Sequence, residues 1–413
     1  MRATGFLIAA ARLVAQPAGL IVYAGAQWLL FAFFLARGGL TAGGDFALAQ
    51  AFAAPLFALF SFSLRQLWVS RPNAAGNYAR LVVLRLGTTA LAAALAVALA
   101  AATGAKIALA PFAFVLFIKA QEAVADIFYA GLDANGRSQV AGLMLGLKGG
   151  SIAAAVGAAL LWDLSAGVLG VLVVVSCGSL LILEGGLARF KADRQSFAVW
   201  REWAGPDAPL RGVGWISLAN VLIAVTGFLP RYVLELFATR ADVGLLAAVM
   251  MPVTLLLLVA TGLSQSSLLE LARAVRDRNA VTFKRVLGYR TALLTSLPVL
   301  LSAILIGAAA TPLTPMFRLD PAVLRLSAGV TILMIPAVVA QIVSYAYLPL
   351  RAYPMLAAIN AAALFIAAVA AWPLVRFHPI YGGAMLACLP SLVQLVAFGT
   401  GLRRHFARQE ASV

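Results

Sequence analysis

The chain has 413 residues, of which 63% are hydrophobic and 11% charged, and its formal net charge is +16. A soluble domain carries roughly 25% charged residues, and a single soluble core stops growing at roughly 250–300 residues. This composition therefore excludes a soluble globular protein, whereas the positive charge by itself is also typical of nucleic-acid binders.

Apolar stretches follow one another along the whole chain, and each is long enough to cross a hydrocarbon core of about 30 Å. The first follows Arg2 and Arg12 and is too long for the apolar core of a signal peptide. We predict an all-α polytopic membrane protein with about twelve spans, near residues 14–36, 46–69, 80–102, 107–131, 138–161, 164–188, 213–233, 243–267, 288–310, 324–347, 354–374 and 380–402.

The distribution of Lys and Arg gives the predicted spans an orientation. An even number of spans places both termini on one side of the membrane, and most of the 31 Lys and Arg residues fall on that side. Loops on the cytoplasmic side carry an excess of Lys and Arg, so both termini are expected in the cytoplasm. The positive charge is thereby explained by topology, and a nucleic-acid partner is not expected.

The two halves of the chain carry similar short segments in the same order. The second span opens at Asp45 and the eighth at Asp242, and each has a proline ten residues later, Pro55 and Pro252. We interpret both Asp residues as helix N-caps. The fourth and tenth predicted spans end in Tyr-Ala-Gly-Leu (129–132) and Tyr-Ala-Tyr-Leu (345–348).

This repeat predicts two lobes. The N-terminal six-helix lobe is expected over 1–188, a cytoplasmic linker over 189–212 and the C-terminal six-helix lobe over 213–413. An even number of spans per half gives parallel repeats related by a pseudo-two-fold axis along the membrane normal. Two such lobes are an architecture of alternating-access transporters.

Three segments resemble a known family. They are Phe-Phe-Leu-Ala-Arg-Gly-Gly-Leu-Thr-Ala-Gly-Gly-Asp-Phe-Ala-Leu-Ala (33–49), Ala-Asp-Ile-Phe-Tyr-Ala-Gly-Leu-Asp-Ala-Asn-Gly-Arg (125–137) and Arg-Tyr-Val-Leu-Glu-Leu-Phe-Ala-Thr-Arg-Ala-Asp-Val-Gly-Leu (231–245). With them the chain resembles the Wzx-type polysaccharide flippases of the MOP superfamily, which are related to MATE transporters. Where that family often has an aromatic residue after the last Gly, this chain has Leu245 and Leu246.

The resemblance implies a function and a location. It implies a bacterial inner-membrane flippase, not an enzyme, that moves oligosaccharide linked to undecaprenyl pyrophosphate to the periplasmic leaflet for O-antigen, lipopolysaccharide or other surface polysaccharide biosynthesis. Other polysaccharide-assembly proteins are expected partners. The motion implied is alternating access by rocking of the lobes.

Charged residues inside spans are costly and therefore mark candidate functional positions. Lys119, Glu122 and Asp126 fall on one face of the fourth span, and Lys148 lies in the fifth. Counting from the turn at 132–137, Glu122 and Lys148 are at similar depth, so they are expected to be able to pair.

Two interpretations of these charges stay open. In the first, Lys119 and Lys148 bind the pyrophosphate, with Arg12, Arg231 and Arg290 as further substrate contacts, and Glu122 or Asp126 binds a coupling proton or sodium ion. In the second, the four charges form a neutral network that holds the spans together, and the three arginines snorkel to the interface. The mid-span polar residues either bind sugar hydroxyls or form interhelical hydrogen bonds; they are Gln50, Asn220, Gln341 and Asn360. The sequence shows no cofactor motif, no metal-ligand cluster and no catalytic group.

Two other functions compete with the flippase. A MATE-like cation-coupled exporter of drugs or metabolites needs membrane-embedded acids, and the first span carries none. A membrane glycan polymerase or ligase tends to carry a large periplasmic loop, whereas every predicted periplasmic loop is short.

Overall fold

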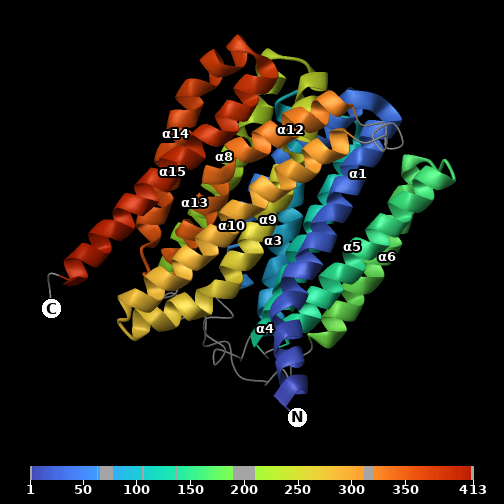
Figure 1. Cartoon of the computed structure of the whole chain (residues 1–413). Helices are drawn as coiled ribbons and strands as arrows, with labels where there is room; N and C mark the ends of the chain where they lie inside the picture. Colours follow the sequence, from blue (N-terminus) through green and yellow to red (C-terminus); the bar gives the residue numbers. More distant parts are fainter. Residues whose placement is uncertain are drawn as a thin grey trace. The chain divides into compact units, whose positions relative to one another are not determined.

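The computed structural model describes residues 2–62, 64–65, 78–104, 107–134, 137–188, 210–310 and 320–410, and the regular structure in these ranges is helical (Figure 1). By length and composition, nine helices in these ranges can cross a membrane, or ten when one bent pair is counted as a single span. The predicted all-α polytopic fold is confirmed. Each predicted span overlaps a helix or part of one.

The first two predicted spans form one continuous stretch, α1 (Arg2–Leu59), which breaks at Gly39. Gly39 has a φ of 66°, in the left-handed region that favours glycine. The ring centroids of Phe34 and Phe46 lie 5.4 Å apart, whereas a straight helix would separate them along its axis by about 18 Å. The two limbs of α1 therefore fold back against each other, so α1 supplies two spans.

Four helices complete the N-terminal bundle: α3 (Tyr78–Ala102), α4 (Leu109–Ala134), α5 (Ser138–Leu161) and α6 (Ala166–Leu187). Helix α4 packs against α3, α5 and α6 and so takes a central place among them. It is not among the nine apolar spans because of its charges, Lys119, Glu122, Asp126 and Asp133. The polar groups of this bundle are thus concentrated on the helix that the others surround.

In its described residues, the C-terminal half of the chain contains α8 (Leu210–Phe237), α9 (Arg240–Arg276), α10 (Ala280–Ala309), α12 (Pro321–Leu333), α13 (Ile335–Ala346), α14 (Tyr353–Phe377) and α15 (Pro379–Glu410). Helices α9, α12 and α13 pack together around buried apolar side chains such as Val249, Val253 and Val330, which α15 joins through Ala384 and Cys388.

The predicted tenth span is two helices, because α12 and α13 meet at Met334 with a bend of 41°. Pro336 lies in the first turn of α13 and has no N–H to continue the hydrogen-bond ladder of α12. The proline therefore accounts for the break within a span that otherwise crosses the bundle as one element.

The chain folds into two compact units, within each of which most contacts between residues are made. Unit 1 contains residues 1–37 and 45–224, and unit 2 contains residues 38–44 and 225–413. This division falls within α8, whereas the predicted linker over 189–212 lies mostly outside the described residues.

The two predicted N-caps are wrong, for different local reasons. The second limb of α1 resumes directly after Gly39, so Asp45 lies inside the helix. Helix α9 begins after Thr239, whose side chain accepts from the Asp242 backbone N–H while the Asp242 carboxylate accepts from the Thr239 N–H. Asp242 is therefore the third residue of a capping box and Thr239 is the N-cap.

Candidate functional site

Lys148 and Glu184 form a fully buried ion pair between α5 and α6. The Lys148 Nζ lies 2.6 Å from Glu184 Oε2, and the side chains are 1% and 0% exposed. The Tyr129 hydroxyl on α4 donates to the other Glu184 oxygen at 2.6 Å, and the Lys148 Nζ lies 5.8 Å from the Tyr129 ring centroid. A buried charge is tolerated when it is paired and hydrogen-bonded, and both conditions are met here.

A second cluster surrounds Glu122, where α4 faces the first limb of α1. Lys119 donates to Glu122 Oε2 at 2.8 Å, and the Tyr23 hydroxyl donates to Glu122 Oε1 at 3.1 Å. Gln27 donates to the same oxygen, and Gln121 donates to the Tyr23 hydroxyl. The side chains of Lys119 and Glu122 are 21% and 27% exposed, so this pair is open to a ligand to a degree that Lys148 and Glu184 are not.

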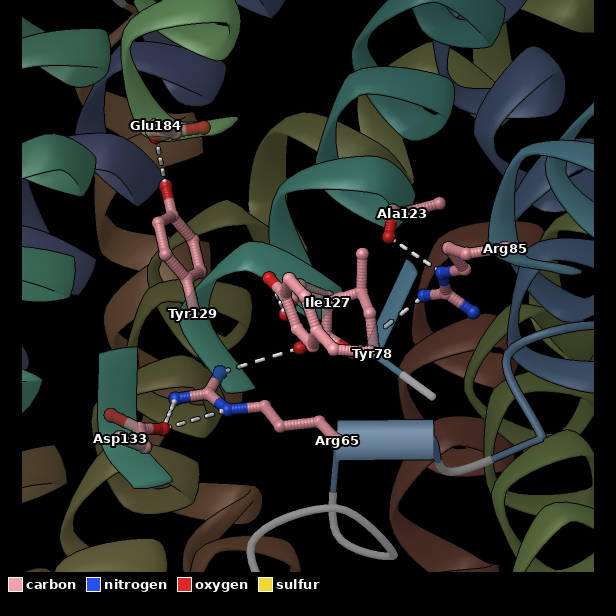
Figure 2. Close-up of polar contacts among 9 residues, drawn as sticks. Arg65, Tyr78, Arg85, Ala123, Ile127, Tyr129, Asp133 and Glu184 are labelled. Atoms are coloured by element: carbon pink, nitrogen blue, oxygen red, sulfur yellow. Dashed lines mark hydrogen bonds and ion pairs between the residues drawn. The ribbon is translucent and has the colours of Figure 1, made fainter. Parts of the chain in front are cut away.

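The third cluster joins Arg65, in the short segment that follows α1, to α3 and α4 (Figure 2). Arg65 donates to Asp133 Oδ2 through Nη2 at 2.7 Å and Nε at 3.1 Å, and to Asp126 at 3.3 Å. Arg85 on α3 is buried; it donates to the Ala123 carbonyl at 2.5 Å and lies 3.6 Å from Asp126. Asp126 is thus shared by two guanidinium groups from two different elements.

Two tyrosines of this region form hydrogen bonds between helices. Figure 2 shows Tyr129 pointing toward Glu184, while the Arg65 guanidinium lies 6.0 Å from the centroid of the same ring. The Tyr78 hydroxyl donates to the Ile127 carbonyl at 3.0 Å. Burial raises the pKa of Tyr78 well above its ordinary value, so Tyr78 stays protonated and keeps donating.

Four cations and four anions therefore meet in three clusters of unit 1. Glu122 pairs with Lys119 and Lys148 pairs with Glu184, so the predicted pairing of Glu122 with Lys148 is wrong. The two side chains do not meet because Lys148 faces α6, whereas Glu122 faces α1. Asp126 belongs with Arg65 and Arg85, although it shares a helix face with Glu122.

Four residues of these clusters are not among the candidates predicted from the sequence: Arg65, Arg85, Asp133 and Glu184. Arg65 and Arg85 lie near the ends of the predicted spans over 46–69 and 80–102, where Lys and Arg are common, and Glu184 precedes two glycines typical of helix packing. The position of Glu184 inside the predicted span over 164–188 was a usable signal, because a charge inside an apolar run requires a partner.

Several neutral polar side chains of unit 2 form hydrogen bonds between helices. Asn360 on α14 is fully buried and accepts from Gln394 on α15 at 2.7 Å. Gln341 on α13 donates to Thr261 on α9 at 3.2 Å. For these two residues, the interhelical interpretation accounts for the contacts.

The three predicted arginine contacts have different surroundings. Arg231, next to Pro230 in α8, is 8% exposed, and its guanidinium lies 4.8 Å from the Phe228 ring centroid. Arg290 is half-buried in α10. The side chain of Arg12 lies outside the described part of the chain. Within the described residues, no group of three or more His, Cys, Asp and Glu is placed to hold a metal ion.

No family model and no curated protein sequence matches the chain. Solved structures do match it over nearly its whole length. A transporter of the MOP superfamily from Pyrococcus furiosus matches with a TM-score of 0.67 at 14% identity, covering 95% of each chain. An outward-facing multidrug resistance MATE family transporter of the MOP superfamily matches with a TM-score of 0.67 at 12% identity, covering 97% of this chain and 96% of its own.

A Vibrio cholerae MATE transporter matches with a TM-score of 0.61 at 14% identity, covering 95% of this chain and 97% of its own. The fold is therefore that of the MATE and MOP-superfamily transporters, and the protein is a multi-pass membrane protein with a transporter fold. At these identities the similarity concerns the fold, and the substrate has to be argued from the residues of this chain.

Proposed function

We propose that this protein is a flippase in the bacterial inner membrane, with both termini in the cytoplasm. Its substrate is an oligosaccharide linked to undecaprenyl pyrophosphate, which it moves to the periplasmic leaflet for surface polysaccharide biosynthesis. Other polysaccharide-assembly proteins supply and consume that substrate. Translocation proceeds by alternating access, in which one lobe rocks against the other around the substrate site.

The observation that carries this proposal is the neutralisation of the acids in unit 1. The carboxylates of Glu122, Asp126, Asp133 and Glu184 each lie within 3.6 Å of a Lys or Arg nitrogen. A cationic substrate gains little from a carboxylate that is already paired, because the resident cation has to be displaced first. This arrangement favours a substrate whose recognition rests on positive groups, as a pyrophosphate requires.

Among the predicted substrate contacts, we assign Lys119 the leading role. Its ammonium group is partly exposed and belongs to a pair that an anionic headgroup can open. Lys148 is assigned to stability, because its charge is buried against Glu184. Arg12, Arg231 and Arg290 remain proposed as further contacts.

Ion coupling is assigned to Glu122 rather than Asp126. When the headgroup draws Lys119 away, Glu122 keeps its neutral donors Tyr23 and Gln27 and gains the capacity to bind a proton or sodium ion. Asp126 holds two arginines, and both would have to be displaced before it bound an ion.

Gene deletion in the native host tests the proposal. We expect lipid-linked repeat units to accumulate on the cytoplasmic side and surface polysaccharide to be lost, as measured by lipid extraction and glycan analysis. Wild-type protein restores the surface polysaccharide, and Lys119→Ala at equal expression does not. The variant Arg325→Gln, at an exposed position near the start of α12, is the control and restores it.

A MATE-like cation-coupled exporter is the second candidate, and the similarity to a multidrug resistance MATE transporter favours it. The same deletion strain separates the two. Unchanged surface polysaccharide with increased sensitivity to cationic drugs assigns the protein to export and contradicts the flippase.

A further inference from the structure

One end of unit 2 carries a dense group of exposed cations contributed by three helices. The group comprises the last turns of α9, the turn to α10, the first turns of α10 and the C-terminal part of α15. We call it the basic cluster; its members are Arg273, Arg276, Arg278, Lys284, Arg285, Arg403 and Arg404, all exposed.

The α9 part of the cluster lies beyond the membrane span. The apolar run of α9 gives way to the polar sequence Ser-Gln-Ser-Ser (264–267), and charged residues follow, while the helix continues to Arg276. In this extension Leu271 and Ala274 are buried, whereas Arg273 and Arg276 are exposed. The extension is therefore amphipathic, with one face on the bundle and a cationic face outward, as in helices that lie at membrane interfaces.

Packing of aromatic rings brings α15 to the same place. The ring centroids of Phe283 on α10 and Phe406 on α15 are 5.2 Å apart, and the Lys284 Nζ lies 5.4 Å from the Phe406 centroid. Arg403 and Arg404 precede Phe406 by less than one turn. Figure 1 shows the turn between α9 and α10 and the C-terminal part of α15 toward the same end.

Tyr289 gives the depth of the cluster. It is 67% exposed, and it follows Arg285 by about one helical turn toward the middle of α10. Exposed tyrosines of membrane proteins gather at the headgroup level. The cations one turn further out therefore lie where lipid phosphates lie.

The charges of the cluster are poorly balanced within the protein. Residues 265–290 and 400–410 contain nine Lys and Arg residues but three acids, Glu270, Asp277 and Glu410. Asp277 contacts Arg276 at 3.4 Å, with the two side chains 61% and 75% exposed, and such exposed pairs are weak. This excess of positive charge produces a positive field at headgroup level, which counter-ions of the membrane can neutralise.

We propose that the basic cluster binds the headgroups of anionic phospholipids. The lipid phosphates would bridge the α9–α10 turn and α15, which lie far apart in the sequence. This binding is independent of which substrate the protein transports.

The test counts bound lipids on the full-length protein by native mass spectrometry, during titration with phosphatidylglycerol or phosphatidylcholine. The variant Arg276→Gln/Arg285→Gln removes two cations of the cluster, one from each helix. The control Arg325→Gln/Arg376→Gln removes two exposed cations at the ends of α12 and α14, outside the cluster. Thermal unfolding of each variant checks that it is folded.

Wild-type protein should bind phosphatidylglycerol in preference to phosphatidylcholine. The cluster variant should lose this affinity by about thirtyfold, since each of the two removed cations contributes roughly 1 kcal/mol near the lipid surface. The control should keep it. Equal binding of both lipids by the wild type, or equal losses in both variants, contradicts the proposal. Displacement of the lipid by micromolar inorganic pyrophosphate would reassign the cluster to a pyrophosphate group and overturn the phospholipid assignment.

Discussion

At Lys148 and Glu184, two opposite charges lie 2.6 Å apart with almost no exposure, and Tyr129 completes the coordination of the carboxylate. Desolvation opposes such a pair, so its net contribution to stability is small compared with the cost of breaking it. A transport site has to open in every cycle. A pair that is costly to break is therefore structural and not a transport site.

The asymmetry gives a prediction for the pair. Glu184→Gln leaves the Lys148 ammonium buried without its counter-charge and should destabilise the protein by roughly 3–5 kcal/mol. Lys148→Gln/Glu184→Gln replaces both charges with amides that can bond to each other and to Tyr129, and should recover most of that loss. Thermal unfolding in detergent measures both variants. A double variant as unstable as the single one would show that the charges themselves are needed.

At the residue scale, the sequence identifies charged residues inside apolar spans, but it does not identify the residues with which they pair. Lys119, Glu122 and Lys148 are visible as charges within apolar runs. The partner of Lys148 depends on which side of α5 faces α6, and periodicity in a helix that is apolar all round does not fix that rotation. The N-cap at Thr239 could be predicted from the sequence, because Thr-Arg-Ala-Asp (239–242) has the spacing of a capping box.

At the scale of elements, the contact of α1 with α5 depends on backbones that approach closely. A Cβ at Gly149 would lie 2.7 Å from backbone atoms of Val22 and Tyr23, whereas a Cβ at Gly150 would meet nothing within 4 Å. Gly149→Ala should therefore push α1 and α5 apart and cost roughly 1–3 kcal/mol. Unfolding temperatures of the two alanine variants make the comparison.

Gly150→Ala is the matched control, since it adds the same methyl group one residue along the same helix. It should be neutral or slightly stabilising, because alanine favours a helix interior over glycine. Equal destabilisation by the two variants would contradict a close α1–α5 contact at Gly149.

Span positions were predictable because a span has to place a long apolar segment in the hydrocarbon core, and such segments are visible in the sequence. The exceptions are positions where backbone geometry, not hydrophobicity, decides. Gly39 alone connects the two limbs of α1, where a longer link was predicted, and Pro336 divides α12 from α13. Neither feature changes the apolar pattern on which the prediction relied.

At the scale of the whole molecule, the fold is that of the MATE and MOP-superfamily transporters, and the charges argue for the substrate of the proposed flippase. Four acids of unit 1, Glu122, Asp126, Asp133 and Glu184, lie against Lys or Arg side chains, and Gln341 and Asn360 of unit 2 bond between helices. The proposed flippase needs one of these pairs to open to an anionic headgroup, and Lys119 with Glu122 is the partly exposed one.

The most direct measurement is translocation in proteoliposomes that contain the purified protein. An undecaprenyl-pyrophosphate-linked oligosaccharide and a fluorescent cationic dye are followed separately. We predict that the wild type moves the lipid-linked oligosaccharide and not the dye, and that Lys119→Ala lowers this rate at least tenfold while Lys148→Gln/Glu184→Gln largely keeps it. Movement of the dye without movement of the lipid-linked oligosaccharide would contradict the flippase and establish cation export instead.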